Sequence, residues 1–210
     1  MSASLTDDLL NQLQGQPLAQ LGSQLGLSQP QTQNAVSAAL PLLLGALGRN
    51  ASQPQGAEAL FGALQRDHAG AGSGLDIGSV LGAVLGGGGA SRQTDGAGIL
   101  GHIFGGRQET AAEGLGQATG LGGSQANTLL KVLAPIVLSY LAQRMMSGGN
   151  QAASPQALGQ VLGQEEQRIS QQGGLGGGLL GAVLDQDGDG QLGLGDLLKI
   201  GGGLLGGGQR

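Results

Sequence analysis

Hydrophobic residues recur along this chain at helical spacing, and no stretch of useful length alternates as a β-strand would. Two segments, residues 35–47 and 129–141, are apolar on nearly every face, which is typical of helices buried among other helices. Each contains a central proline, Pro41 or Pro135, which removes a helical hydrogen bond and kinks or splits the helix. The pattern predicts an all-α, multihelical fold.

Shorter helices are expected beside the two long ones. Polar links containing proline precede residues 57–64 and 157–169, and proline is favoured in the first helical turn. Ser28 and Ser124, each followed three residues later by an amide side chain, occupy the expected N-cap positions of the long helices. Glycine-rich stretches, expected to be joints, lie at 86–89, 173–178 and 201–208.

A repeat with an offset of 94 residues relates two parts of the chain. Leu-Gly-Ser-Gln-Leu-Gly-Leu at 21–27 matches Leu-Gly-Gln-Ala-Thr-Gly-Leu at 115–121, and Pro41 then matches Pro135. Each copy reads as a short helix, a Gly-Leu corner and a long apolar helix. We therefore expect two duplicated helical modules, followed by a glycine-rich segment. The expected boundaries are 1–90, 91–172 and 173–210.

The clearest chemical motif lies in the C-terminal segment. Oxygen-bearing residues stand at positions 1, 3, 5, 7 and 12 of a twelve-residue loop with glycine at position 6, which is the spacing of a calcium-binding EF-hand loop. Because glycine lacks a Cβ, it permits the sharp turn that this position requires. The predicted metal ligands are Asp185, Asp187, Asp189, Gln191 and Asp196.

This ligand set favours Ca²⁺, with Mg²⁺ as the other cation that it would take. Asp196 stands where Glu is usual, and Gly193 leaves position 9 to water, so we expect a dissociation constant on the order of 10⁻⁵ to 10⁻³ M. The alternative is an acidic turn without metal. A related loop at 66–76 keeps Asp67 and Asp76 but has alanine at the inner positions, so it is expected to be a degenerate copy.

Charge and composition exclude several classes of protein. Four of the fourteen acidic residues are aspartates of this loop, so nine basic residues face ten acidic ones elsewhere. The basic residues are scattered and only three residues are aromatic, which argues against nucleic-acid binding. There is no cysteine, which excludes disulfides and thiolate metal sites. The N-terminus lacks the features of a secretory signal, and the longest apolar segment, 129–142, is too short to span a membrane, so a cytoplasmic protein is expected.

No arrangement of residues predicts catalysis. The two histidines, His68 and His102, are far apart in sequence, and His102 lies in an apolar helical stretch where a capped or packed side chain is expected rather than a base. Glu165 and Glu166 are expected on a solvated helix face. The motifs of nucleophile elbows, phosphate loops and zinc proteases are absent from the sequence, so we predict that the protein is not an enzyme.

Three segments resemble a widespread bacterial family of unknown function. They are Leu-Pro-Leu-Leu-Leu-Gly-Ala-Leu at 40–47, Asp-Gly-Ala-Gly-Ile-Leu-Gly-His-Ile-Phe-Gly-Gly-Arg at 95–107, and Leu-Asp-Gln-Asp-Gly-Asp-Gly at 184–190. The two Leu-Gly…Pro modules are also similar to those of the YidB proteins, distant relatives with a compact multihelical fold. The resemblance implies an all-α fold and a bacterial source, and it implies no activity.

These observations predict a non-enzymatic helical protein with one calcium-binding loop, acting as a structural or interaction module whose protein partner is not specified. The first alternative is calcium-dependent self-assembly into a homo-oligomer, because EF-hand loops usually pair and this chain has one intact loop. The second alternative is association with a membrane surface through the apolar helices.

Overall fold

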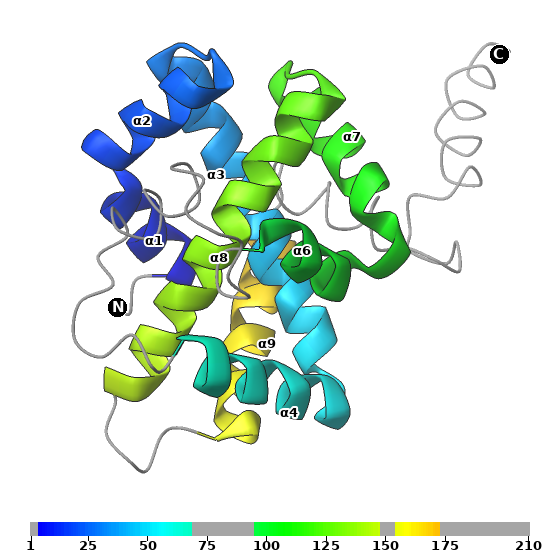
Figure 1. Cartoon of the computed structure of the whole chain (residues 1–210). Helices are drawn as coiled ribbons and strands as arrows, with labels where there is room; N and C mark the ends of the chain where they lie inside the picture. Colours follow the sequence, from blue (N-terminus) through cyan, green and yellow to red (C-terminus); the bar gives the residue numbers. More distant parts are fainter. Residues whose placement is uncertain (1–3, 69–94, 148–153, 173–210) are drawn as a thin grey trace, which may run out of the picture.

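The structure, a computed structural model, describes residues 4–68, 95–147 and 154–172, and every regular element in these ranges is a helix (Figure 1). The predicted all-α fold is therefore confirmed. The elements are α1 (Leu5–Leu13), α2 (Gln16–Leu25), α3 (Gln29–Ala51), α4 (Pro54–Ala63), the π-helical turn η1 (Leu64–His68), α6 (Gly96–Phe104), the 3₁₀ turn η2 (Gly105–Arg107), α7 (Gln108–Thr119), α8 (Gly123–Ser147) and α9 (Pro155–Gln172).

The two long helices, α3 and α8, run through the middle of the molecule (Figure 1). They pack on each other, α9 packs mainly on α3 and α4, and α6 and α7 pack on α8. Every residue from 38 to 48 of α3 and from 132 to 138 of α8 is buried. The predicted buried helices are confirmed, and the core is built almost entirely from Leu, Ala, Val and Ile.

Pro41 and Pro135 lie inside α3 and α8, which continue through them. Of the two predicted effects, a kink or a split, the split is wrong. Pro135 has no N–H, and the carbonyl of Lys131, one turn earlier, loses its helical donor. The first residue of α6 lies directly against this carbonyl: a Cβ added at Gly96 would overlap it. Glycine at position 96 thus lets α6 approach the backbone of α8 at the turn that Pro135 alters.

The two Gly-Leu corners end α2 and α7 in the same way. Gly26 and Gly120 both adopt the left-handed conformation, with φ of 66° and 74°, that glycine enters without strain. At the first corner the N–H of Leu27 donates to the carbonyl of Gly22 at 2.8 Å, as in a Schellman motif. The corners also contact each other, because Gln125 Nε2 donates to the carbonyl of Leu25 at 3.2 Å.

The predicted start of the first long helix is confirmed and that of the second is wrong. Ser28 is the N-cap of α3, and its N–H donates to Gln31 Oε1 at 3.1 Å. Helix α8 begins at Gly123, so Ser124 is already helical. The equivalent contact there is from the N–H of Gly122 to Gln125 Oε1, at 3.2 Å. The 94-residue offset relates Ser28 to Gly122. The offset therefore predicts the start of α8 correctly, whereas the preference for serine at the N-cap pointed to Ser124.

One helix in the described part of the chain, α8, is long and apolar enough over Gly123–Met145 to cross a membrane by length and composition alone. The expectation that no segment reaches this length was therefore wrong. Of the most apolar window in this helix, 72% is buried inside the protein. A helix in the core of a folded domain has the same character, so the length by itself assigns no membrane role.

Candidate functional site

The predicted calcium ligands Asp185, Asp187, Asp189, Gln191 and Asp196 all lie outside the described residues, as do the three glycine-rich joints and the expected boundaries at 90 and 173. Within residues 4–68, 95–147 and 154–172, no group of three or more His, Cys, Asp or Glu side chains comes together to hold a metal ion. The calcium site therefore remains a prediction from the spacing of the sequence.

The loop expected at 66–76 begins as a helix. Residues 66–68 belong to η1, the π-helical turn that continues α4, so this part of the loop prediction was wrong; residues 69–76 lie outside the described ranges. Single π-helical turns often occur at functional sites, because the wider turn redirects side chains. Here the turn carries Arg66 at the edge of a pocket.

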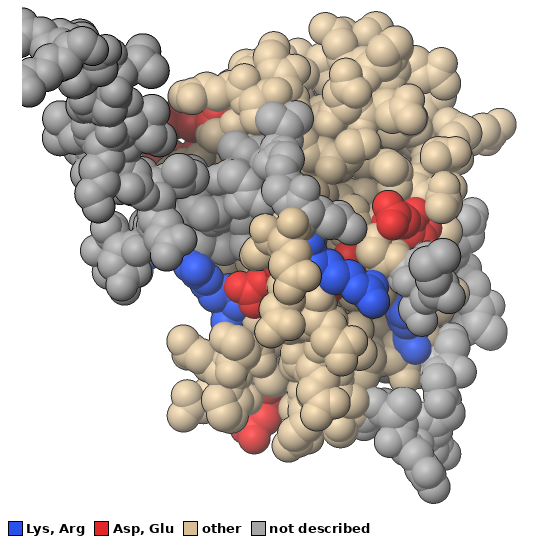
Figure 2. All heavy atoms as spheres, turned by 180° about the vertical axis from the view of Figure 1, so that it is seen from behind, with Lys and Arg blue, Asp and Glu red and all other residues tan. Residues whose placement is uncertain are grey.

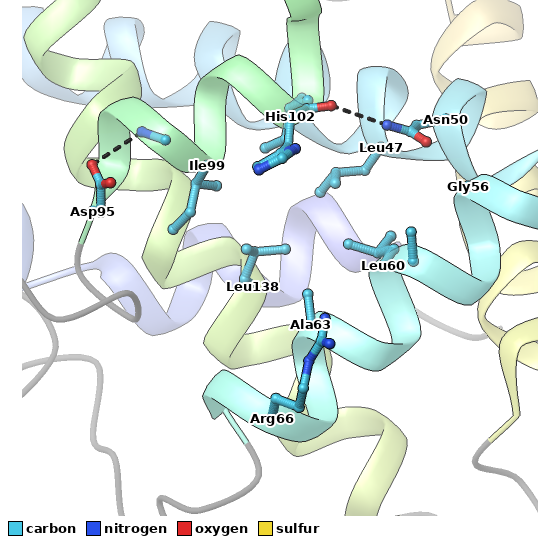
Figure 3. A pocket seen from close by; sticks show the side chains of 13 residues that line it. Leu47, Asn50, Gly56, Leu60, Ala63, Arg66, Asp95, Ile99, His102 and Leu138 are labelled. Carbon is cyan, nitrogen blue, oxygen red and sulfur yellow. Dashed lines mark hydrogen bonds between the residues drawn. The ribbon is translucent and has the colours of Figure 1, made fainter.

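This pocket has a volume of about 460 Å³ and lies between α3, α4, η1, α6 and α8 (Figure 3). Its floor is apolar. Leu47 and Leu138 are almost fully buried, with 1% and 5% of their surfaces exposed, and Leu60 and Ile99, which also line the floor, are partly buried. This volume lies in the size range of small-molecule sites.

The rim of the pocket is polar. Asn50 Nδ2 donates to the carbonyl of His102 at 3.1 Å and so ties the end of α3 to α6. Asp95 caps α6, because its Oδ1 accepts from the N–H of Gly98 at 3.0 Å. The His102 side chain is exposed and its ring points into the pocket (Figure 3), so the expectation of a packed histidine was wrong. Arg66 is exposed and lies on the other side of the opening.

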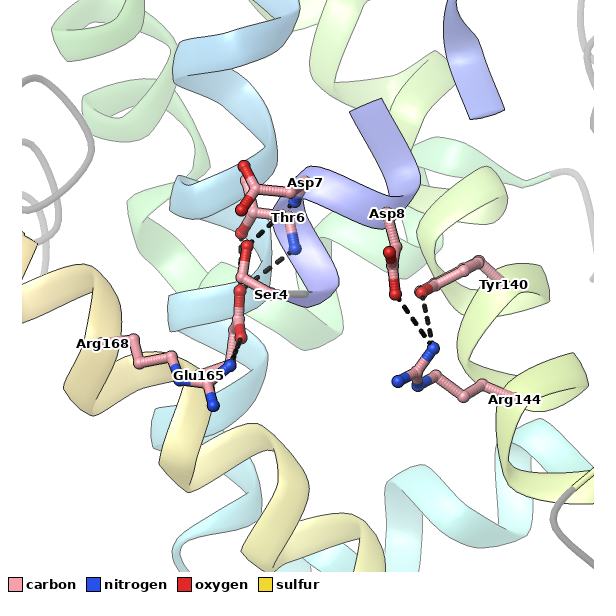
Figure 4. Close-up of polar contacts among 8 residues, drawn as sticks. All are labelled: Ser4, Thr6, Asp7, Asp8, Tyr140, Arg144, Glu165 and Arg168. Carbon is pink, nitrogen blue, oxygen red and sulfur yellow. Dashed lines mark hydrogen bonds and ion pairs between the residues drawn. The ribbon is translucent and has the colours of Figure 1, made fainter. Parts of the chain in front are cut away.

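A second polar cluster joins α9 to the start of α1 (Figure 4). Glu165 is only 3% exposed, so its expected place on a solvated face was wrong. Its Oε1 accepts from the N–H of Thr6 at 3.1 Å and from the Thr6 hydroxyl at 2.8 Å. The first N–H groups of a helix have no partner within the helix and attract negative charge. Glu165 therefore caps α1 from a helix more than 150 residues away in sequence.

Near it, Arg144 in the last turn of α8 reaches the first turn of α1. Its Nη1 lies 3.1 Å from Asp8 Oδ2 and 3.4 Å from the Tyr140 hydroxyl (Figure 4). Burial raises the pKa of the Tyr140 phenol above its ordinary value, while the positive charge of Arg144 opposes that rise. This contact connects the C-terminal end of α8 to the N-terminal end of α1. The positive charge of Arg144 and the negative charge of Asp8 each interact favourably with the dipole of their own helix.

The neighbouring Glu166 has a different environment from Glu165. Burial raises the pKa of its carboxyl group above the ordinary value, and Arg49, with Nε 4.0 Å from Oε1, only partly opposes this. Glu166 Cβ also lies near Gly48, where α3 and α9 approach each other closely. The carboxyl group thus loses hydration without gaining a strong partner.

Charged side chains are sparse on the face shown in Figure 2, where basic and acidic residues are mixed and separated by uncharged surface. This is consistent with the scattered basic residues of the sequence. Sequence reasoning missed the pocket because its lining comes from five elements between residues 47 and 138. The one local signal was Arg66 at the end of an apolar helix, and this residue alone indicates no ligand.

A search of curated proteins and a search of solved structures each found no match to this chain. The similarity to YidB proteins remains a prediction. The model of one protein family, by contrast, matches residues 7–144, from the first turn of α1 to the last turns of α8, and includes both proline-containing helices. The chain therefore belongs to a family of bacterial proteins of unknown function, DUF937.

Proposed function

We propose that this protein is a non-enzymatic helical module of the bacterial cytoplasm that binds one Ca²⁺ ion through residues 185–196 and acts as a structural or interaction element. The observation that carries the proposal is the match of five ligand positions and one glycine, in order, to the EF-hand pattern. The helical domain supplies the scaffold, with α3, α8 and α9 forming a continuous core.

The charge distribution supports a cation at this loop. Asp185, Asp187, Asp189 and Asp196 place four carboxylates within twelve residues, while the rest of the chain is close to neutral. Carboxylates held this close repel one another until a cation neutralises them, so metal binding and folding of such a loop are coupled. Weak binding, with a dissociation constant on the order of 10⁻⁵ to 10⁻³ M, follows from Asp at position 12.

Calorimetric titration of the full chain with CaCl₂ tests this proposal. The wild-type protein is expected to release or absorb heat with a saturable isotherm, and Asp187→Ala is expected to abolish it. The matched control is Asp76→Ala, which removes the same charge from the degenerate loop of the first half and is expected to leave the isotherm unchanged. Identical isotherms for the wild type and Asp187→Ala would refute the proposal, and a parallel titration with MgCl₂ measures selectivity.

We also propose that the two halves arose by duplication. Support comes from pairs of positions 94 residues apart with the same local role: Gly26 and Gly120 at corners, Gln31 and Gln125 at helix starts, and two prolines in buried helices. An experimental structure in which α2–α3 and α7–α8 fail to superimpose would contradict this origin.

Self-assembly is the partner proposal that follows from a single intact loop, since such loops usually pair. Light scattering of the full chain with and without calcium measures it. This alternative predicts a dimer that requires calcium, and a monomer in both states would exclude it.

A further inference from the structure

The pocket beneath Arg66 and His102 is lined by residues that the proposed calcium binding does not use. Its floor is a hydrocarbon surface formed by Leu60, Ile99 and Leu138, and its rim carries polar groups from three separate elements. A concave apolar floor with a few converging polar groups is the usual character of a small-molecule site. The volume, about 460 Å³, lies in the range of such sites.

The hydrogen bonds at the rim indicate which of its groups remain for a ligand. The Asn50 amide N–H is used by the carbonyl of His102, and Asp95 Oδ1 is used by the N–H of Gly98. Among the residues whose side chains the structure describes, ion pairs are found for Arg49, Arg144 and Arg168 but not for Arg66. Its guanidinium offers five donors in a planar fork that matches a carboxylate.

We propose that this pocket binds a small amphipathic carboxylate, with its anionic group on Arg66 and its short aliphatic chain on Leu60, Ile99 and Leu138. Arg66 attracts the anionic group on the η1 side of the pocket, whereas the Asp95 carboxylate lies on the α6 side and caps that helix. The apolar floor favours a hydrocarbon body over a sugar or a nucleotide. The His102 ring lies beside the bound chain and reports its presence. The proposed site uses none of the predicted calcium ligands and needs no metal.

Proton NMR of the full chain tests the proposal with octanoate as the probe. The chain has two histidines, so His68→Gln leaves His102 as the single imidazole signal. Octanoate is expected to shift this signal saturably, with a dissociation constant on the order of 10⁻⁴ M, as expected for a ligand of about ten non-hydrogen atoms. Hexanoate and decanoate measure the dependence on chain length.

Substitutions test the charged part and the apolar part of the site one at a time. Arg66→Gln is expected to weaken octanoate binding about tenfold, the value of one charge-assisted contact, and to change binding of octan-1-ol by less than about twofold. Arg210→Gln removes the same charge at the last residue of the chain and is expected to leave both affinities unchanged. Ala59→Phe, at an exposed position lining the pocket, is expected to abolish binding of both probes.

The outcomes are distinct. No saturable shift of the His102 signal up to about 10 mM octanoate would overturn the proposal, since this exceeds the expected constant a hundredfold. Equal affinity of the wild type and Arg66→Gln for octanoate would also overturn it. Because Arg66 is exposed, its substitution leaves the core intact, and a circular dichroism melt checks this.

Discussion

Replacing Glu165 tests whether the contact between α9 and the first turn of α1 stabilises the domain. The carboxylate is 3% exposed and accepts two hydrogen bonds from Thr6, at 3.1 and 2.8 Å, in the first turn of α1. Hydrogen bonds to a charged group are each worth about 1.5–3 kcal/mol. Glu165→Ala removes both and leaves the N–H of Thr6 without its partner. Part of the loss is offset because the buried charge also disappears.

The expected loss in free energy of unfolding for Glu165→Ala is about 2–4 kcal/mol, which corresponds to a fall in Tm of roughly 5–15 °C for a domain of this size. Glu165→Gln keeps an acceptor and is expected to lose about half as much. The matched control is Arg168→Gln, because this arginine lies 3.8 Å from Glu165 but is largely exposed, and such pairs contribute under about 1 kcal/mol.

Urea unfolding followed by circular dichroism measures all three variants. A double-mutant cycle with Thr6→Val isolates the hydroxyl contact from the loss of the buried charge. If the free energy of unfolding of Glu165→Ala lies within about 0.5 kcal/mol of the wild type, the size of a neutral surface substitution, then Glu165 does not cap α1 in solution.

Two further predictions concern the packing and titration of the domain. Gly96→Ala places a methyl group on the carbonyl of Lys131 and is expected to lower the free energy of unfolding in urea by about 1–3 kcal/mol. Gly101→Ala, in the same helix with open space around it, is expected to raise it by about 0.5–1 kcal/mol. Equal stabilities of the two variants would contradict the close approach of α6 to α8. Glu166 has a raised pKa in the folded protein, so its protonation contributes stability that is fully present below the unfolded pKa and is lost as pH rises through the folded pKa. The stability of Glu166→Gln relative to the wild type is therefore expected to increase with pH in urea unfolding between about pH 4 and pH 7, and a difference that stays constant over this range would show that burial does not shift this group.

The fold class and the central helices could be predicted from the sequence, because they depend on local patterns. Leu, Ala and Val on nearly every face of residues 35–47 and 129–141 indicate a buried helix. Apart from Ser37, Lys131 and Ser139, every residue of both segments is buried. The Gly-Leu corners at Gly26 and Gly120 were predictable for the same reason, since a left-handed residue that ends a helix is nearly always glycine.

The remaining features depend on contacts that are distant in sequence. Glu165 looks like a solvated residue in its own helix, and only the position of α1 makes it a cap. The pocket exists because α3, α4, α6 and α8 converge, so neither Arg66 nor His102 indicates it locally. Pro135 was expected to kink or split its helix, and α8 is not split. The start of α6 lies against the carbonyl that the proline leaves without a helical donor.

We propose that this chain carries a single calcium site in the loop that begins at Asp185. Equilibrium dialysis of the full chain against ⁴⁵Ca²⁺ tests it most directly, because it counts bound ions without relying on heat or conformation. The wild type is expected to bind one ion per chain at saturation, and Asp187→Ala is expected to bind none. No bound calcium in the wild type, or one ion still bound to Asp187→Ala, would contradict it.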